Sequence, residues 1–585
     1  MSNRKFPLIF LIPYLGKYRY RIVLGSLMVA CTVVASMFSP WVLKYVIDDL
    51  QQLLERDKLL YYAALILGLS ALEGFFRFWM RRILIGVSRE VEYDLRNDFL
   101  SHVQKMSLSF LQSRSTGDIM SRATNDLNAV RSVLGPGIMY SMNTVTQAVI
   151  VTVVLLRLNW KLALLAYIPL VLLSITMKKF GQQIHDRFES IQAQFSNLST
   201  KAQENLSGIR VIKAFSREKS EINEFEKLND DYVHRNISLI RLWGVFYPLI
   251  AALTGMSAVA LLWYGGRQVI LGNLTLGEFV AFMNYLFMLT WPTIAVGWVI
   301  NIFQRGSASM GRMLEIMDTE PEIHDEPSAS VPKAVQGALE FRNLTFQYPN
   351  STIPALRNIS MTVPAGSTLA IVGHTGSGKS TVVNLIPRLY NPPPGTVFID
   401  GQDVRQWPLS ELRNNIGYVP QETFLFSDTI RENIAFGSDA SSSDVPVEWA
   451  AGVSQIAEDI EAFSEKMKTY VGERGITLSG GQKQRVAISR AVAVLPKILI
   501  FDDSLSNVDT YTEERILEKL TDVMKDRTTI LVSHRISTVK NAHQIIVLKD
   551  GKIVEHGTHE SLMALQGVYA DLYQKQLLEE ELRVS

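Results

Sequence analysis

The chain has 585 residues, more than one ordinary domain, and a net charge of only +1, which predicts no nucleic-acid partner. The single cysteine, Cys31, excludes a disulfide framework within the chain. Hydrophobic residues make up 47% and charged residues 20%, with a mean hydropathy of +0.12, so an apolar part and an ordinary soluble part share one polypeptide.

The chain begins with a short apolar segment that follows two basic residues, Arg4 and Lys5. This pattern is also typical of a signal peptide, but Pro13 interrupts it and no small-residue cleavage site follows. We therefore interpret the segment as an amphipathic helix at the membrane surface that leads into the first span.

Six apolar stretches in the N-terminal half are each long enough to cross a bilayer, which takes about 20 residues. They cover residues 21–46, 59–80, 135–157, 160–178, 242–268 and 277–303. Gly, Ser, Thr or Pro interrupts several of them, as spans that pack against protein tolerate. The sequence therefore predicts an α-helical transmembrane domain of six spans over residues 1–316.

Lys and Arg accumulate in the segments after the second and fourth stretches. Basic residues accumulate on the cytoplasmic side of membrane proteins, so these segments, the N-terminus and the C-terminal half are predicted to be cytoplasmic. The short turns near Asn159 and Asn273 are predicted to face outward, which makes the chain a multi-pass protein of the cell (inner) membrane. The basic residues used here are Arg81, Arg82, Arg89, Arg96, Lys105, Arg114, Arg122, Lys178, Lys179, Arg187, Lys201, Arg210 and Lys213.

The two basic segments are too long for turns and lack clusters of Pro or Gly. Apolar residues recur every three to four positions through Val91–Leu111 and Ile191–Phe215, which predicts helical stalks that continue the spans. The alternative is a solvated charged face without a partner. Each stalk has a short break, near residues 115–122 and 204–215, where the chain can turn and present a small transverse helix to another domain.

The boundary between the two halves is predicted at residues 317–336. Asp318–Lys333 is rich in Pro, Ser and acidic residues and has no periodicity, which is typical of a linker. From residue 337 to 585 the pattern predicts an α/β domain, because the strand STLAIVG runs directly into GHTGSGKS and then into the helix STVVNLIPRLY. Strand, glycine-rich loop and helix is the order that a phosphate-binding P-loop needs.

Three motifs in this half predict an ATP-driven machine. Gly373–Ser380 has the GxxxxGK[ST] spacing, in which glycine N–H groups surround phosphates, Lys379 neutralises them and the Ser380 hydroxyl ligates Mg²⁺. LSGGQ follows at Leu478–Gln482, and the apolar strand and acid pair ILIFDD at Ile498–Asp503. A buried strand that ends in an aspartate suits a carboxylate that holds the magnesium shell, and ATP and Mg²⁺ are the expected cofactors.

With these motifs the chain resembles an ABC exporter half-transporter, in which six membrane helices precede one ATP-binding domain. The resemblance covers nearly the whole chain. Its most specific element is YVGERGITLSGGQ at Tyr470–Gln482, where the resemblance implies that Glu473 contacts the stalks. It also implies that the breaks near 115–122 and 204–215 are coupling helices, which transmit motion of the ATP-binding domain to the spans.

The resemblance implies roles for four further side chains. Tyr348 corresponds to the aromatic residue that stacks on adenine, and His534 to the switch histidine that contacts the γ-phosphate. Gln421 corresponds to the glutamine that touches magnesium and the attacking water, and Asp502 to the aspartate of the magnesium shell. Each has a plain alternative as an ordinary strand, core, surface or turn residue. The expected metal ligands are Ser380, Gln421 and Asp502, and the expected catalytic residues are Asp503, His534 and Gln421.

Two sets of residues are expected to bind ATP. The P-loop set binds the nucleotide of this chain, whereas in this family the signature set binds the ATP held by the other subunit, so a half-transporter acts only as part of a dimer. Closure of two such domains on ATP, and opening after hydrolysis, then alternates the access of the spans. The residues are Gly373, Thr375, Gly376, Ser377, Gly378, Lys379, Ser380 and Thr381 in the P-loop set, and Ser479, Gly480, Gly481 and Gln482 in the signature set.

Asp503 departs from the family, which carries at this position the glutamate thought to polarise the attacking water. Aspartate is one methylene shorter, a loss of roughly 1.5 Å of reach. We expect slow or absent hydrolysis at this P-loop, as in one member of a heterodimeric multidrug-type exporter of bacteria whose intact signature completes a competent site on the partner. The alternative is that the carboxylate shifts slightly and still works.

The sequence leaves the cargo open. Aromatic and Met residues in spans two and six can line a pocket for small amphipathic compounds, although lipid contact or helix packing is the alternative. Glu73 is unusual because a carboxylate deep in an apolar run is costly, and Arg77 four residues on can neutralise it. A structural ion pair and a cation- or proton-sensitive binding residue are both open.

The expected function is therefore ATP-driven export of amphipathic small molecules, lipids or peptides, as one half of a heterodimer. Three alternatives remain: a homodimeric lipid flippase, a homodimeric drug exporter with slow ATPase, and an ATP-gated subunit that does not export. The expected partners are a second half-transporter, membrane lipids and the amphipathic substrate.

Overall fold

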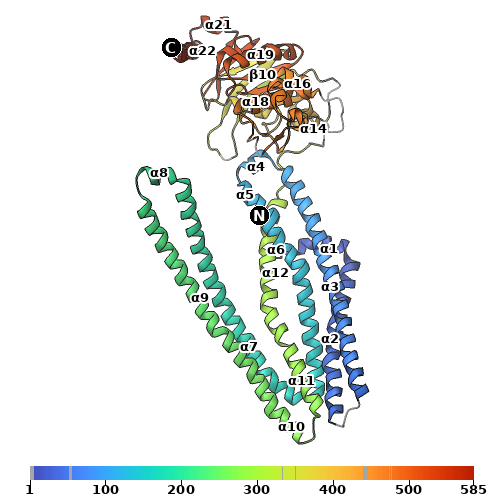
Figure 1. Cartoon of the computed structure of the whole chain (residues 1–585). Helices are drawn as coiled ribbons and strands as arrows, with labels where there is room; N and C mark the ends of the chain where they lie inside the picture. Colours follow the sequence, from blue (N-terminus) through green and yellow to red (C-terminus); the bar gives the residue numbers. More distant parts are fainter. Residues whose placement is uncertain are drawn as a thin grey trace. The chain divides into compact units, whose positions relative to one another are not determined.

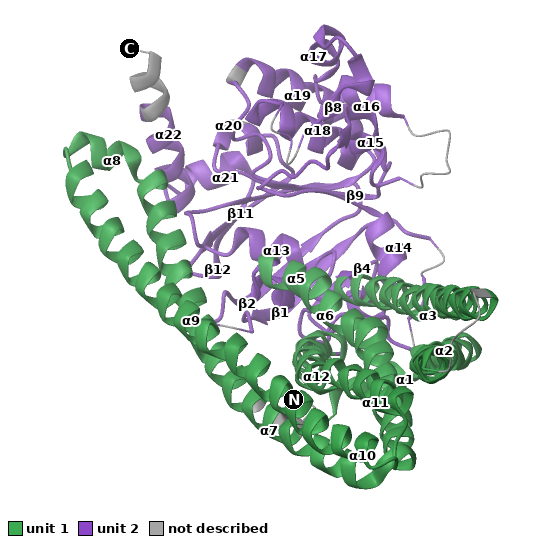
Figure 2. Cartoon of the chain, turned by 60° about the horizontal axis from the view of Figure 1, so that its bottom comes forward, with its two compact units in different colours: residues 1–103, 117–319 green, residues 104–116, 320–585 purple. Residues whose placement is uncertain are grey.

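The computed structural model describes residues 6–51, 56–327, 329–331, 334–349, 351–438, 446–472, 475 and 477–584. The chain forms two compact units (Figure 2): unit 1 is Met1–Val103 with Gly117–Thr319, and unit 2 is Gln104–Thr116 with Glu320–Ser585. Residues 104–116 therefore belong to unit 2, although they lie inside the predicted transmembrane domain, 1–316.

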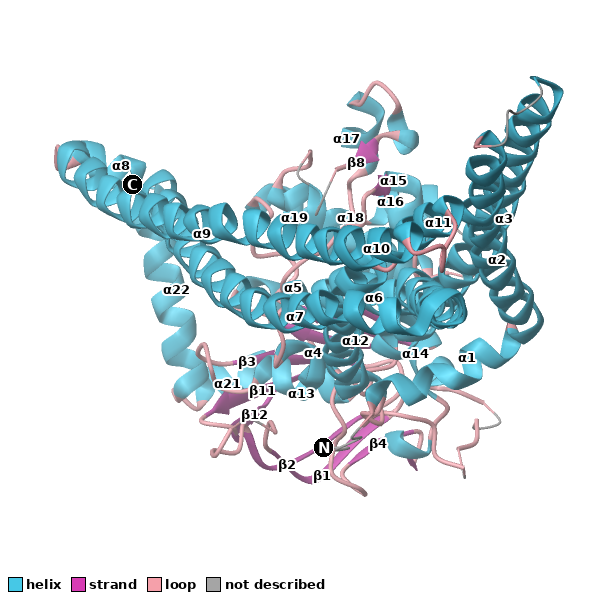
Figure 3. Ribbon diagram, turned by 90° about the horizontal axis from the view of Figure 1, so that it is seen from below, coloured by secondary structure: helices cyan, strands magenta, loops and turns pink. Residues whose placement is uncertain are grey.

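Unit 1 is entirely helical in its described part (Figure 3). Its elements are η1 (Pro7–Leu11), α1 (Ile12–Lys17), α2 (Arg19–Leu50), α3 (Arg56–Gln104), α5 (Thr116–Ser121), η2 (Arg122–Asp126), α6 (Leu127–Ser132), η3 (Val133–Gly137), α7 (Ile138–Ser207), α8 (Ile209–Ala214), α9 (Glu218–Ala260), η4 (Leu261–Gly265), α10 (Gly266–Ile270), α11 (Leu276–Met288) and α12 (Thr290–Met317). The long helices α3, α7 and α9 extend well beyond the predicted spans, as helical stalks require.

Five helical runs in the described part of the chain are long and apolar enough to cross a membrane: Arg19–Leu50, Asp57–Gln104, Thr116–Ser207, Glu218–Ile270 and Leu276–Met317. The third run turns back at Asn159, whose extended backbone (φ −162°, ψ 104°) interrupts α7. Its side-chain oxygen accepts from the N–H of Leu162 at 3.0 Å, and the hydroxyls of Thr152 and Tyr167 hydrogen-bond across the turn. A straight helix would separate these two residues by about 22 Å, so the five runs hold six spans.

The interior of unit 1 is built from helix faces that are far apart in sequence. α7 and α9 run side by side, with α8 at their shared tip (Figure 1). Val33 of α2, Leu155 of α7 and Phe282 of α11 lie in one buried apolar cluster, and the buried hydroxyl of Tyr285 donates to the carbonyl oxygen of Met37 at 2.7 Å. The helices therefore pack against each other as well as presenting apolar surface outward.

Unit 2 is an α/β unit. Its strands are β1 (Leu339–Phe346), β2 (Leu356–Val363), β3 (Thr368–Val372), β4 (Val397–Ile399), β5 (Gln402–Asp403), β6 (Ile416–Val419), β7 (Asp428–Thr429), β8 (Tyr470–Val471), β9 (Ile498–Asp502), β10 (Thr528–Val532), β11 (Gln544–Lys549) and β12 (Lys552–Gly557). They form sheets of order β2-β1-β4-β5, β12-β11-β3-β10-β9-β6 and β7-β8. Its helices are α4 (Leu108–Gln112), α13 (Lys379–Leu385), η5 (Val404–Gln406), α14 (Leu409–Asn414), α15 (Ile430–Ala435), α16 (Val447–Val453), α17 (Ala457–Ala462), η6 (Lys466–Lys468), α18 (Gly480–Ala493), α19 (Thr510–Met524), α20 (Ile536–Val539), α21 (His559–Ala564) and α22 (Val568–Val584).

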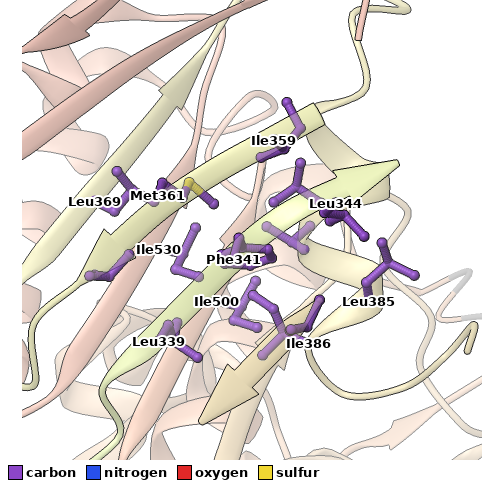
Figure 4. Close-up of a cluster of buried hydrophobic side chains, with 14 of the residues drawn as sticks. Leu339, Phe341, Leu344, Ile359, Met361, Leu369, Leu385, Ile386, Ile500 and Ile530 are labelled. Carbon is purple, nitrogen blue, oxygen red and sulfur yellow. The ribbon is translucent and has the colours of Figure 1, made fainter. Parts of the chain in front are cut away.

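The six-stranded sheet is the structural centre of unit 2. All five residues of β3, β9 and β10 are buried, as expected for parallel strands covered on both faces. Ile500 and Ile530 of these strands meet Phe341 of β1 and Leu385 of α13 in one apolar core (Figure 4). The strand, glycine loop and helix predicted around the P-loop are therefore anchored in the core.

The segment predicted as a linker, 317–336, is attached to unit 2 over its described part from residue 320. The N–H of Leu409 donates to Asp325 at 2.8 Å, and the amide of Asn391 donates to the carbonyl oxygen of Glu322 at 3.0 Å. A further bond joins Ser330 N–H to the Gln406 carbonyl at 3.0 Å. Sequence showed no periodicity here because these attachments are made by irregular backbone and isolated polar side chains.

The predicted segment 115–122 contains the short helix α5, and a second short helix, α4, comes before it in the chain. Ser109 of α4 donates to Glu322 at 3.1 Å, and Gln112 of α4 accepts from the hydroxyl of Tyr390 at 2.7 Å. These contacts place residues 104–116 in unit 2. The second predicted segment, 204–215, contains α8 at the tip between α7 and α9.

Candidate nucleotide-binding site

The predicted ATP-contacting loops gather at one edge of the six-stranded sheet. β3, β10, β9 and β6 are parallel neighbours, so their carboxyl ends meet at the same edge. The P-loop follows β3, His534 follows β10, Asp502 ends β9 and Gln421 follows β6. Ligands of open parallel sheets bind outside these carboxyl ends. The topology therefore brings together four loops that are distant in sequence.

The P-loop glycines adopt backbone conformations that other residues rarely take. Gly373, Gly376 and Gly378 have φ values of +148°, +81° and +102°. A Cβ on Gly373 would lie 2.3 Å from the carbonyl oxygen of Leu548, and one on Gly378 2.8 Å from Leu356. Thr375 and Gly376 are exposed at the loop's tip. The loop thus needs glycine for both its curvature and its close packing.

Two polar groups in the loop suit a phosphate ligand. Lys379 is buried, and its Nζ donates to the carbonyl oxygens of Gly373 at 2.8 Å and His374 at 3.0 Å. Burial lowers the pKa of Lys379, while the charges of Asp503 and Asp502 oppose that shift. The buried Ser377 hydroxyl has no hydrogen-bond partner in the described part of the chain. A phosphate would give both groups a stronger, charged acceptor.

The P-loop and the end of β9 meet at a pair of oxygen donors. Ser380 Oγ donates to Asp502 Oδ1 at 3.1 Å, and Asp502 is buried. Burial raises the pKa of Asp502 above its usual value, and the hydrogen bond from Ser380 acts in the opposite direction. Hydroxyl and carboxylate oxygens are the ligands that Mg²⁺ takes, so Ser380 and Asp502 fit a nucleotide-bound Mg²⁺, while the third expected ligand, Gln421, remains a prediction.

Tyr348 lies beside the helix that follows the P-loop. Its hydroxyl is 3.0 Å from the hydroxyl of the buried Thr381, and its ring meets Tyr390 edge to face at 5.0 Å and 85°. Tyr390 in turn bonds to Gln112 of α4. The predicted adenine contact is therefore part of an aromatic cluster that reaches α4, a connection that the sequence did not reveal because the residues are far apart in the chain.

Gln421 is exposed, and the part of its loop that follows, from Phe424 to Phe426, is held by hydrogen bonds from two helices. Asn433 of α15 bonds to both the N–H and the carbonyl of Phe426, at 2.8 and 2.9 Å. Arg490 of α18 donates to Asn433 and, at 3.0 Å, to the carbonyl oxygen of Phe424. Burial lowers the pKa of Arg490 to about 10. The loop is thus fixed to the signature helix α18 by side chains that no motif identified.

His534 sits on a backbone segment that α22 holds in place. The side chain of Gln576 accepts from the N–H of Ile536 at 2.8 Å and donates to the carbonyl oxygen of His534. The next residue, Arg535, pairs with the buried Glu513, which also accepts from Thr538 at 2.6 Å. Gln576 is a positioning residue that sequence reasoning missed, since a glutamine in a C-terminal helix carries no signal of its own.

The pKa of His534 predicts how ATP affinity depends on pH. Burial and the nearby charge of Lys379 hold the pKa of His534 below its usual value, which favours the neutral imidazole. A γ-phosphate beside it would raise that pKa, so ATP binding takes up a proton between the two values and becomes tighter as the pH falls through that window. We expect the ATP Kd of the wild type, divided by that of His534→Gln, to decrease from pH 8 to 5.5.

The His534→Gln reference removes the contributions of ATP itself and of Lys379, since both proteins share them. The expected change is up to about tenfold for each pH unit within the window. Isothermal titration calorimetry at five pH values measures it. Two parallel curves would show that His534 does not meet the phosphate.

Asp503 lies immediately after Asp502, and at this residue the backbone leaves the extended conformation of β9. Its φ of +47° is left-handed, a region that aspartate tolerates better than most residues. Its N–H donates to the carbonyl oxygen of Val532 at 2.8 Å, and its carbonyl accepts from Ser506 at 3.0 Å. Its half-buried carboxylate acts electrostatically on both Lys379 and His534. The geometry places the shorter acid among the expected phosphate-contacting groups.

The signature residues lie at the start of α18. Ser479 caps this helix: its hydroxyl accepts from the N–H of Gln482 at 3.2 Å, and the Gln482 side chain accepts from the N–H of Ser479 at 3.0 Å. Gln482 also donates to Asp459 at 2.8 Å. Gly480, the first residue of α18, is exposed, and N–H groups in the first turn of a helix have no intrahelical acceptor, so the Gly480 N–H can serve an anion.

The loop after Asp503 connects the end of β9 to the signature helix α18. The N–H of Asn507 donates to Gln484 of α18 at 3.0 Å, and a Cβ on Gly481 would lie 3.0 Å from the carbonyl oxygen of Asn507. The loop that follows β9 is therefore in direct contact with the start of the signature helix. Glu473, which we predicted to contact the stalks, lies outside the described residues.

Comparison with known proteins agrees with this architecture. Residues 22–293 match the ABC transporter transmembrane region, and residues 356–506 match the ABC transporter family. The chain is 37% identical, over 96% of both chains, to the probable multidrug resistance ABC transporter ATP-binding/permease protein YheI of Bacillus subtilis. It is 35% identical to the ATP-dependent lipid A-core flippase of Syntrophus aciditrophicus, over 96% of this chain and 93% of that one.

A solved structure is similar over nearly the whole length. It is that of a bacterial Atm1-family ABC exporter with ATP bound, with a TM-score of 0.77 and 30% identity, covering 95% of this chain and 98% of the other. The predicted fold class, a helical transmembrane domain followed by an ABC nucleotide-binding domain, is confirmed. The chain belongs to the ABC exporters as a half-transporter, a multi-pass membrane ATPase whose hydrolysis is coupled to transport.

Proposed function

We propose that this chain is one half of a heterodimeric exporter of amphipathic small molecules, lipids or peptides, and that its own P-loop hydrolyses ATP slowly. The observation that carries the proposal is Asp503, an aspartate in the place of the catalytic glutamate, beside a complete P-loop and an intact signature. The site at the carboxyl ends of β3, β10, β9 and β6 would bind MgATP tightly and retain it. The site on the partner's P-loop would hydrolyse ATP repeatedly.

The need for a second chain is supported by two surfaces. The exposed N–H of Gly480, in the first turn of α18, would help to complete a nucleotide site on the partner's P-loop. At the tip of unit 1, the apolar side chains of Leu206, Val211 and Phe215 around α8 are 75%, 61% and 74% exposed. Exposed apolar clusters of this kind mark interaction sites. Because α8 is expected to be a coupling helix, we infer that the partner's ATP-binding domain contacts it.

The same elements account for transport. ATP bound at the cytoplasmic side would close two ATP-binding domains on each other, and α4 and α8 would carry that movement to the spans. Each site residue would have its own role. Lys379 and the loop N–H groups would bind the phosphates, and Ser380, Asp502 and Gln421 would bind Mg²⁺. Tyr348 would stack on adenine, and His534 would contact the γ-phosphate.

The identity of the second subunit is tested by purification. The full-length, tagged chain is isolated from its native membrane, and native mass spectrometry measures which half-transporter accompanies it. We expect a one-to-one complex with a different half-transporter that carries glutamate after its magnesium-binding aspartate, and ATP-driven transport by that complex in proteoliposomes. A homodimer with brisk, transport-coupled ATPase contradicts the proposal and supports the homodimeric alternatives.

A further inference from the structure

Unit 1 contains a cavity of about 370 Å³ that is lined by α2, α3, α7, α11 and α12. Three of its lining residues are charged: Glu73, Arg77 and Arg81 of α3. They are spaced four residues apart, so they form a column along one face of the helix, each about 6 Å from the next. Ionisable groups in or next to a span are costly and mark functional sites by default.

The charges in this cavity do not cancel. Glu73 is already neutralised, because Arg77 donates to it in an ion pair in which the two side chains are 23% and 54% exposed. Arg81 makes no ion pair with a carboxylate in the described part of the chain. Among the described charged side chains of the cavity, the two guanidinium groups therefore exceed the one carboxylate by a single positive charge.

The remainder of the wall is amphipathic. Asn143 and Gln147 of α7 add side-chain amides next to the charged column, and the Gln147 amide N–H donates to the carbonyl oxygen of Met288 at 3.1 Å. Tyr140 and Trp291 contribute aromatic surface. Aromatic and methionine side chains accommodate apolar chains of varied shape. Polar recognition and apolar accommodation thus occur in one cavity.

We propose that this cavity binds the head of an anionic amphiphile, with a phosphate or carboxylate at Arg77 and Arg81 and the apolar part along Tyr140 and Trp291. Guanidinium groups suit such an anion because they bind its oxygens in pairs. The inference rests on the proposed export function, whose substrate class it names. It also sets aside the cation site that Glu73 alone suggested, since Arg77 already occupies that carboxylate.

Equilibrium binding to the full-length chain in phosphatidylcholine nanodiscs tests the assignment. The probes are 1-oleoyl lysophosphatidate, the uncharged 1-oleoylglycerol, the cationic oleylamine and inorganic phosphate. We expect lysophosphatidate to bind about tenfold or more tighter than either other oleoyl compound, since charge-assisted hydrogen bonds separate them. We expect inorganic phosphate alone to bind far more weakly, because it lacks the apolar part.

Three variants locate the binding in the cavity. Arg81→Gln should weaken lysophosphatidate binding about tenfold and leave oleoylglycerol within twofold. Glu73→Gln should strengthen lysophosphatidate binding several-fold, because it frees Arg77 and removes a repelling charge. Arg82→Gln makes the same charge change on the neighbouring residue, which does not line this cavity, and should have no effect.

Several outcomes would overturn the assignment: tighter binding of oleylamine, equal binding of inorganic phosphate, or an equal loss in Arg81→Gln and Arg82→Gln. The opposite signs expected for Arg81→Gln and Glu73→Gln separate binding from misfolding, which weakens both. Transport by the assembled complex is measured in parallel. ATP-driven movement of amphiphiles without preference for the anion removes this inference alone, whereas loss of all ATP-driven movement removes the proposed export function.

Discussion

Replacing Asp503 by glutamate should raise ATP hydrolysis at this chain's P-loop by about 10², because a general base that is misplaced by roughly 1 Å loses a factor of that order. The rate gain corresponds to about 2.7 kcal/mol of transition-state stabilisation. Glutamate tolerates the left-handed φ of +47° less well than aspartate, a strain of about 1 kcal/mol that leaves the gain in place.

The measurement needs a complex in which only this site can turn over. The chain is assembled with a partner whose own catalytic glutamate is replaced by glutamine, and single-turnover hydrolysis is followed with labelled ATP. Asp503→Asn is the matched control, since it keeps the length of the side chain and removes the charge, and it should not gain activity. Equal single-turnover rates for the wild type and Asp503→Glu would contradict the proposal that this site is degenerate.

Replacing Gly373 by alanine should weaken ATP binding by roughly 10²–10³-fold, because the new Cβ would lie 2.3 Å from the carbonyl oxygen of Leu548 and the backbone would keep a φ of +148°. Leu548 belongs to β11, whose backbone is fixed in the sheet, so the loop must move instead. Movement of the loop displaces the N–H groups that surround the phosphates.

Gly376→Ala is the matched control for this effect. Its φ of +81° is also left-handed, but a Cβ there meets no atom within 4 Å, so strain alone remains and the loss should be about tenfold. Titration with a fluorescent ATP analogue measures both variants, and thermal unfolding shows whether each still folds. Similar affinities for the two variants would mean that the contact with Leu548 does not shape the loop.

The sequence predicted the architecture well because the signals for spans and P-loops are local. Each span is a predominantly apolar run of sufficient length, and the predicted turn at Asn159 is present as an extended residue that caps the next helix. The P-loop was found from eight consecutive residues, and its strand and helix from the pattern on either side. Comparison with known proteins then confirmed the fold class.

The supports of the site could not be predicted, because they depend on pairs of residues that are distant in the chain. Gln576 holds the backbone of His534 across 42 residues, and Arg490 holds Asn433 across 57. The position of α4 depended on Gln112 and Tyr390, which are 278 residues apart. Single-residue patterns carry no record of such pairings, whereas packing in the folded unit decides them.

The bond between Gln112 and Tyr390 connects α4 to the predicted adenine contact, Tyr348. Tyr390 touches Tyr348 with its ring and α4 with its hydroxyl, so one side chain serves two neighbours. Under the proposed function, adenine stacked on Tyr348 would therefore act on α4 through Tyr390, and binding of the nucleotide would reach this helix without hydrolysis. A subunit that keeps its nucleotide bound while the partner hydrolyses ATP would need such a connection.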